Sequence, residues 1–256
     1  MTTIVRMTSA QLLTLCKRRA LMAWSAALWV GGQIVFYGLG VLQHATDPVH
    51  HAPAGGLKGL ANAMMLLNYL GGVAAVLIGT AAGGGDTAAG VFRDLASTGR
   101  SRIALFAVRI PSALLVTFAF ATVSFACTAT GAVLFTAAGP GPSARILAGC
   151  GIAVAASAAL STILAVGLSS AMSSRSVTIG LLLCWNLALG RILEHATGLG
   201  SLRDTVSLAA GDRLVPTAVG GTYVVPMPVS TAVLVLLVWA VIPVVAGAWQ
   251  TARRDA

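Results

Sequence analysis

The sequence alternates between long apolar runs and short polar stretches, and this pattern predicts six membrane-spanning helices. About 20 apolar residues suffice for an α-helix to cross the hydrocarbon core of a bilayer. Pro111, near the start of the third run, predicts a kink there. The predicted spans cover residues of about 21–42, 60–82, 103–137, 146–171, 177–193 and 231–249.

Composition supports the same fold class. Hydrophobic residues make up 57% of the 256 residues and charged residues 9%, and the mean hydropathy is +0.89. So little polar surface cannot coat a water-soluble domain. We therefore expect an all-α integral membrane protein in which residues 1–256 form a single membrane domain, with no room for a soluble catalytic domain.

The N-terminal segment, residues of about 4–20, predicts an amphipathic helix ahead of the first span. Its polar side carries Gln11, Thr14, Lys17 and Arg18, which would lie among anionic head groups. We expect this helix to lie at the membrane interface. Its expected apolar side consists of Leu12, Leu13, Cys16 and Ala20.

The connection between the second and third spans, residues 79–109, predicts a short helix of its own at about 87–98. Asp86 or Thr87 can cap its start, and Gly99 suits the left-handed conformation that comes after a last helical turn. An apolar side and a charged side result from helical spacing. The apolar side holds Ala88, Val91, Phe92 and Leu95, whereas Arg93, Asp94 and Ser97 face elsewhere, and Arg100 follows the helix.

The longest loop, residues of about 194–230, separates the fifth and sixth predicted spans. Leu199, Leu202, Val206 and Ala209 recur in it at helical spacing, and prolines interrupt the rest of the loop. We expect a re-entrant or interfacial helix on the outer leaflet that packs on the bundle, because irregular backbone at membrane depth must be covered.

Charge distribution indicates the orientation. With both termini, the 79–109 connection and the 172–176 turn in the cytoplasm, the cytoplasmic side carries +8 and the outer side +1, in agreement with the net charge of +9. This asymmetry obeys the positive-inside rule. The high pI therefore needs no nucleic acid, and no nucleic-acid partner is expected.

The sequence lacks the residue patterns that several classes of enzyme require. No GxxxxGK[ST] or HExxH pattern occurs, so the chain itself is not expected to hydrolyse ATP or to be a zinc protease of the usual kind. The four cysteines have no CxxC spacing and are expected to be buried small residues. His44, His50, His51 and His195 map to the outer face, where two interpretations stay open: solvated loop residues, or a metal site completed by Asp47 and Glu194.

Polar residues within the spans are the remaining candidates for a function. Gln33, Asn62, Asn68 and Asn186 each need a partner or water in hydrocarbon. They either line a translocation path or join helices by hydrogen bonds, and the sequence leaves both open.

The whole pattern resembles the permease subunits of type-2 ATP-binding-cassette (ABC) exporters. The likeness rests on the basic N-terminal helix, the six spans, the outer helical insertion and two motifs. The motifs are the loop D-x-x-x-G-x-F-R-x-L-x-x-T-G-R-S-R, which begins at Asp86, and the C-terminal G-x-W-x-x-x-R-R-D-A, which begins at Gly247.

The resemblance implies that a separate cytoplasmic ATPase binds ATP and Mg²⁺ and drives this chain. Helix 87–98 would be the coupling helix, and this chain would bind no cofactor. A second permease half, identical or related, would complete the transporter. The implied coupling residues are Asp86, Val91, Phe92, Arg93, Asp94, Leu95 and Arg100.

The family's central path, between the first, second and fifth spans, singles out Gln33, Asn68 and Asn186. The implied cargo is amphipathic or lipid-like: a drug, as in multidrug efflux, an antibiotic, a lipid or a modified peptide. A composition rich in Ala, Gly and Arg suggests a bacterial plasma membrane. The alternatives are a surface helix that merely lies on lipid, a non-transporting scaffold or immunity subunit, and a membrane enzyme using the outer histidines.

Overall fold

Within the residues that the structure describes, six helical segments are long and apolar enough to cross a membrane, in agreement with the predicted number of spans. The computed structural model describes residues 2–88, 101–136, 141–172, 174–220 and 224–253, and these ranges contain helices but no strand. The spans are Arg19–Thr46, Gly56–Gly85, Arg102–Leu134, Ala144–Met172, Arg175–His195 and Val229–Arg253.

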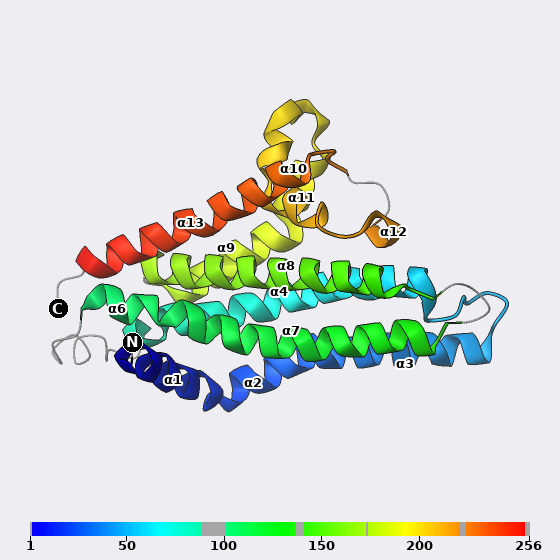
Figure 1. The fold of residues 1–256 in the computed structure, drawn as a ribbon, viewed down its shortest axis with the longest axis horizontal. Helices are drawn as coiled ribbons and strands as arrows, with labels where there is room; N and C mark the ends of the chain where they lie inside the picture. Colours follow the sequence, from blue (N-terminus) through cyan, green and yellow to red (C-terminus); the bar gives the residue numbers. More distant parts are fainter. Residues whose placement is uncertain (1, 89–100, 137–140, 173, 221–223, 254–256) are drawn as a thin grey trace.

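Three long helices form the centre of the bundle (Figure 1). They are α4 (Gly56–Ala88), α7 (Arg109–Leu134) and α8 (Ala144–Met172), and α4 packs most extensively on α8. The first span packs on α4 and α7, whereas α13 (Val229–Arg253) packs on α8. The core therefore lies between the second, third and fourth spans.

The first and fifth spans are each interrupted by one π-helical stretch. Such wider turns often occur at functional sites because they re-aim side chains. In the first span the order is α2 (Arg19–Ala26), η1 (Ala27–Gly31) and α3 (Gly32–Thr46). In the fifth it is α9 (Arg175–Cys184), η2 (Trp185–Leu189) and α10 (Gly190–His195).

Helix α4 continues beyond the predicted end of the second span. The glycine-rich stretch after residue 79 stays helical because it packs closely on α8: a Cβ added at Gly83 would lie 2.5 Å from the carbonyl oxygen of Val166. Asp86 and Thr87 therefore lie in the last turn of α4, and the prediction that they begin a separate helix is wrong. Residues 89–100, with most of the predicted coupling helix, lie outside the described residues.

The two ends of the described chain, in α1 (Thr2–Cys16) and α13, lie at one end of the bundle (Figure 1). Helix α1 packs on α7. Its predicted apolar side is partly wrong, because Leu15 is buried whereas Leu13 is 60% exposed. Leu12 and Leu15 of α1 pack in the core of the bundle, so tertiary contacts help to determine which side of the helix is covered.

The third span is divided as Pro111 predicts. Helix α6 (Arg102–Ala107) is followed by Val108 as its C-cap, and α7 begins at Arg109. Proline cannot donate a backbone hydrogen bond to the residue four positions earlier, which here is Ala107. The side chain of Ser101 caps α6 by accepting a hydrogen bond from the backbone nitrogen of Ala104 at 3.2 Å.

The described part of the outer insertion is helical, but it forms three short helices and not the single helix that was predicted. They are η3 (Thr197–Thr205), α11 (Ser207–Asp212) and α12 (Thr217–Gly220). Gly200, with a φ of 53°, interrupts the helical backbone within η3. The insertion packs on the bundle as expected, because α11 contacts α8 and α13, and α12 contacts α4.

Candidate functional site: a polar cavity within the bundle

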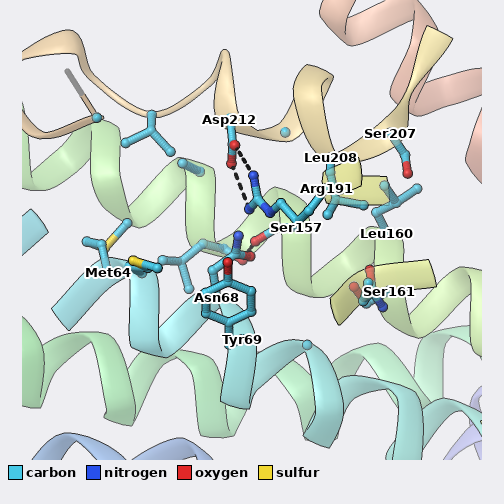
Figure 2. A pocket seen from close by; sticks show the side chains of 18 of the residues that line it. Met64, Asn68, Tyr69, Ser157, Leu160, Ser161, Arg191, Ser207, Leu208 and Asp212 are labelled. Carbon is cyan, nitrogen blue, oxygen red and sulfur yellow. Dashed lines mark hydrogen bonds and ion pairs between the residues drawn. The ribbon is translucent and has the colours of Figure 1, made fainter. Parts of the chain in front are cut away.

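A cavity of about 410 Å³ lies between the core helices and the outer insertion. Helices α4 and α8 form one wall, η2 and α10 another, and α11 and α12 cover it (Figure 2). Ser157 and Ser161, which line it, lie near the middle of α8 (Ala144–Met172). The cavity therefore extends from the middle of α8 toward the end of the bundle that carries the outer insertion.

Helical spacing explains how the polar lining forms. Asn62 and Tyr69 lie on one side of α4, because residues three, four or seven positions apart share a helical face, and Asn68, next to Tyr69, lines the same cavity. Ser157 and Ser161 obey the same rule on α8. Two facing helices thus supply amides and hydroxyls to one space.

The π-helical stretch η2 supplies the third polar side. Asn186 lies in η2 and lines the cavity, and its buried Nδ2 has no hydrogen-bond partner within the described structure. A buried donor without a partner is unfavourable, since its hydration is lost and nothing replaces it. A ligand or water in the cavity would relieve this cost.

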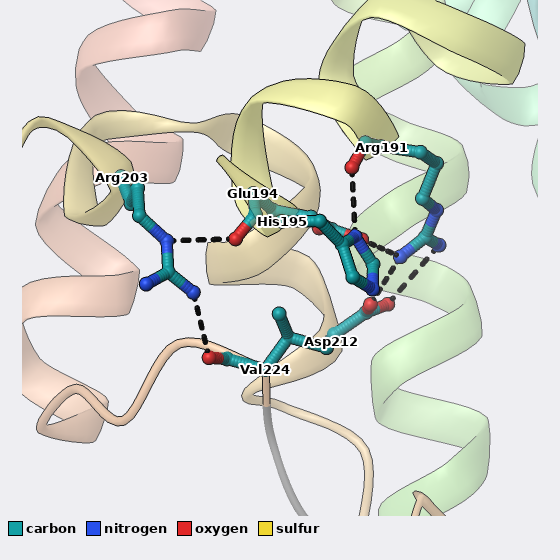
Figure 3. Close-up of polar contacts among 6 residues, drawn as sticks. All are labelled: Arg191, Glu194, His195, Arg203, Asp212 and Val224. Atoms are coloured by element: carbon teal, nitrogen blue, oxygen red, sulfur yellow. Dashed lines mark hydrogen bonds and ion pairs between the residues drawn. The ribbon is translucent and has the colours of Figure 1, made fainter. Parts of the chain in front are cut away.

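A charged cluster closes the side of the cavity near the insertion (Figures 2 and 3). Arg191 Nη1 donates to Glu194 Oε1 at 2.8 Å and to Asp212 Oδ2 at 2.5 Å, and Nη2 approaches Asp212 Oδ1 at 3.5 Å. The guanidinium also lies 5.8 Å from the centre of the Tyr69 ring. Arg191 thus joins the fifth span to α11 and faces the cavity.

Glu194 is the most deeply buried member of this cluster. It is 1% exposed, and its Oε2 has no hydrogen-bond partner in the described part of the chain. Arg203 Nε donates to the Glu194 carbonyl at 2.7 Å, and Arg203 Nη2 donates to the Val224 carbonyl at 3.0 Å (Figure 3). These bonds fix the insertion on the end of the fifth span.

Apart from Ser207, whose hydroxyl accepts a hydrogen bond from Trp185 Nε1 at 3.0 Å, the rest of the lining is apolar. Methionine and leucine side chains cover the space between the polar groups, and these flexible side chains adapt to ligands of different shape. A cavity that combines apolar walls with a few hydrogen-bonding groups suits an amphipathic molecule. The apolar lining includes Met64, Met65, Leu160, Leu164, Leu187, Leu208, Val215, Val219 and Leu236.

Two of the three predicted path residues, Asn68 and Asn186, line this cavity. Gln33 does not: it is fully buried, and its Nε2 donates to the Ala63 carbonyl at 3.4 Å. Gln33 thus joins the first span to α4, as the alternative of an interhelical hydrogen bond predicted.

Most predicted coupling residues lie outside the described residues, from Val91 to Arg100; of Asp86, only the place in α4 is described. The helices before and after this stretch are described, and hydrogen bonds join them. Arg109 at the start of α7 is 1% exposed, and its Nη1 donates to the Gly83 carbonyl of α4 at 2.8 Å. Ser170 Oγ of α8 donates to the same carbonyl at 3.1 Å.

The outer histidines do not converge. His50 pairs with Asp47 at 2.7 Å, and His44 Nδ1 contacts the His51 carbonyl, whereas His195 lies beside Glu194. Within the described ranges, no group of three or more His, Cys, Asp or Glu side chains is placed to hold a metal ion. Of the cysteines, Cys150 is buried but Cys16 and Cys184 are exposed, so burial was wrongly predicted for these two.

The charge distribution counts Arg191 and Asp212 among the residues of the outer side, but it gives no sign that both line the cavity. One local signal was present, since Arg191 and Glu194 are three residues apart on one helix. Asp212 gave none, because its position depends on how the insertion folds back. No family model matches the sequence, and no curated protein matches it either.

Proposed function

We propose that this chain is the membrane-spanning permease subunit of an ATP-driven ABC exporter that moves an amphipathic or lipid-like cargo out of the cytoplasm or the inner leaflet. The observation that carries the proposal is the cavity that extends from the middle of α8 to the outer insertion. Amide and hydroxyl groups that include Asn68 and Asn186 line it, the Arg191 cluster closes one side, and methionine, leucine and valine side chains cover most of the rest. In transporters, substrate sites near mid-membrane typically occur where irregular helices supply polar groups.

The lining supports an amphipathic cargo. Asn186 Nδ2 and Arg191 Nε are buried donors with no hydrogen-bond partner in the described structure, so an acceptor group of the cargo would bind at that side. The apolar part would lie along the methionine and leucine side chains. A sugar or an inorganic ion would leave these apolar walls without contacts.

The connectivity supports coupling to a separate ATPase. Residues 89–100 join α4 to α6, and both helices reach the bundle end that carries the termini (Figure 1). In the proposed complex, Phe92 and Leu95 fill an apolar groove of the ATPase, while Arg93 and Asp94 fix the register. The bonds of Arg109 and Ser170 to the Gly83 carbonyl would carry the motion to α4, α7 and α8.

A second permease half would cover lipid-facing surface that this chain leaves open. The first, fifth and sixth spans have mostly uncovered apolar side chains, whereas the second is the most covered of the six. Both halves would lie in a bacterial plasma membrane with their termini in the cytoplasm. ATP and Mg²⁺ would bind to the ATPase alone.

Affinity purification of the tagged chain in mild detergent tests the proposal. We expect a soluble ABC ATPase to co-purify, and the Phe92→Ala/Leu95→Ala variant to lose it while remaining inserted and helical. Ile103→Ala/Val123→Ala removes similar apolar area from two exposed positions and should retain the ATPase. Recovery of other partners without an ATPase would instead support a scaffold or immunity subunit.

A further inference from the structure

A second cavity, of about 310 Å³, lies at the end of the bundle that carries the termini and is separate from the polar cavity. Its lining consists of Arg18, Ala20, Leu21, Trp24, Leu77 and Arg175. The first span, α4 and the start of α9 meet here. Two cationic side chains and an apolar surface thus share one small space.

The two arginines lack anionic partners in the described structure. Arg18 Nη1 donates to the Ala81 carbonyl at 3.3 Å, and neither Arg18 nor Arg175 forms an ion pair with a described residue. Two guanidinium groups lining one cavity repel each other. Arg175 is also the first residue of α9, where the helix dipole is already positive. An anion between the two guanidinium groups would reduce both their mutual repulsion and the repulsion between Arg175 and the helix dipole.

The apolar lining determines which anion fits. Leu21 is buried, Leu77 is half-buried, and Trp24 is 65% exposed at the start of the first span. Tryptophan is common where acyl chains meet head groups, because its ring is apolar and its N–H is polar. Inorganic phosphate would contact the arginines but leave this apolar surface unused.

From this juxtaposition we propose that the cavity binds an anionic phospholipid. The phosphate group lies between Arg18 and Arg175, and an acyl chain packs along Leu21, Trp24 and Leu77. Because Arg18 comes after α1 and Arg175 begins α9, the bound lipid joins the N-terminal helix to the fifth span. This site requires neither an ATPase nor a cargo.

Native mass spectrometry of the purified full chain in neutral detergent tests the proposal. Phosphatidylglycerol and phosphatidylcholine with identical chains are titrated separately, and the ratio of their dissociation constants is measured. A basic residue near an anionic head group contributes about fivefold in affinity. Arg18→Gln/Arg175→Gln should therefore reduce the preference for phosphatidylglycerol about 30-fold.

A matched control separates the cavity from general surface charge. Lys17→Gln/Arg19→Gln removes two charges from exposed neighbouring positions and should change the preference less than about threefold. Arg175→Gln alone, at an exposed position, should still lower it about fivefold if the double variant does not fold.

Three results would overturn the proposal. They are an unchanged preference in the cavity variants, an equal loss in the control, and displacement of the bound lipid by millimolar glycerol 3-phosphate. The last result would assign the cavity to a soluble phosphate.

Discussion

Replacing Arg191 should destabilise the protein more than the removal of an ordinary surface ion pair. Arg191→Met removes the guanidinium that donates to Glu194 Oε1 at 2.8 Å. Glu194 is 1% exposed, and its nearest remaining ionisable neighbour in the described cluster, His195 Nδ1, is 3.7 Å away. The variant therefore retains a buried carboxylate whose charge has lost its main partner.

The expected size depends on the burial of each partner. Breaking a buried ion pair by removing one member costs about 3–5 kcal/mol. The side chain of Asp212 is 37% exposed, so water would hydrate its carboxylate once Arg191 is gone. The Arg191–Asp212 ion pair therefore contributes less than about 1 kcal/mol to stability. We expect Arg191→Met to lower the free energy of unfolding by about 4 kcal/mol, and Asp212→Asn by less than about 1 kcal/mol.

Reversible denaturation by SDS in mixed micelles, followed by circular dichroism, measures these differences. The double variant Arg191→Met/Glu194→Gln should recover most of the lost stability, because no uncompensated charge then remains. The reasoning would be refuted if Arg191→Met cost less than about 1 kcal/mol. It would also be refuted if the double variant were as unstable as the sum of the two single variants, since the pair would then not be coupled.

Three further substitutions test the packing, the first π-helical stretch and the coupling. Gly83→Ala should lower the free energy of unfolding by about 1–3 kcal/mol in the same denaturation assay, because the added Cβ would lie 2.5 Å from the Val166 carbonyl oxygen. At Gly180 no atom lies within 4 Å of an added Cβ, so Gly180→Ala should stabilise α9 by up to about 1 kcal/mol. Ser124→Ala removes the hydroxyl that donates to the Trp29 carbonyl in η1 and should lower the free energy of unfolding by about 1 kcal/mol. Ser157→Ala, at a half-buried position, should lower it less. Equal losses of stability in the two variants would contradict a special role of the Ser124–Trp29 hydrogen bond. Phe92→Ala/Leu95→Ala should leave the chain folded but abolish cargo-stimulated ATP hydrolysis in the purified complex, and unchanged stimulation would contradict the coupling role.

The spans could be predicted because lipid imposes a simple requirement on sequence. Each helix must be apolar over about 20 residues and must satisfy its own backbone, so runs such as 231–249 mark it directly. Errors occurred where tertiary packing overrides local signals. The glycines before Asp86 indicate a helix end by propensity, but close packing on α8 keeps α4 helical to Ala88.

The candidate site could be predicted only in part. Asn68 and Asn186 stand out in the sequence because amides are unfavourable in hydrocarbon. Gln33 stands out for the same reason, yet it bonds to the backbone of α4, and sequence cannot tell a lining residue from a helix-joining one. The pairing of Arg191 with Asp212 depends on the return of the insertion onto the fifth span, a contact between residues 21 positions apart.

The most direct test of the account is whether the polar cavity responds to ATP. Asn68→Cys is introduced into a chain whose four cysteines are replaced by Ser, and its reaction with a small maleimide is timed in the complex with the ATPase. We predict that ATP with vanadate changes the labelling rate at least about tenfold, and that Phe92→Ala/Leu95→Ala abolishes the change. The same labelling rate with and without nucleotide, in a complex that hydrolyses ATP, would contradict the proposal that this cavity is the export path.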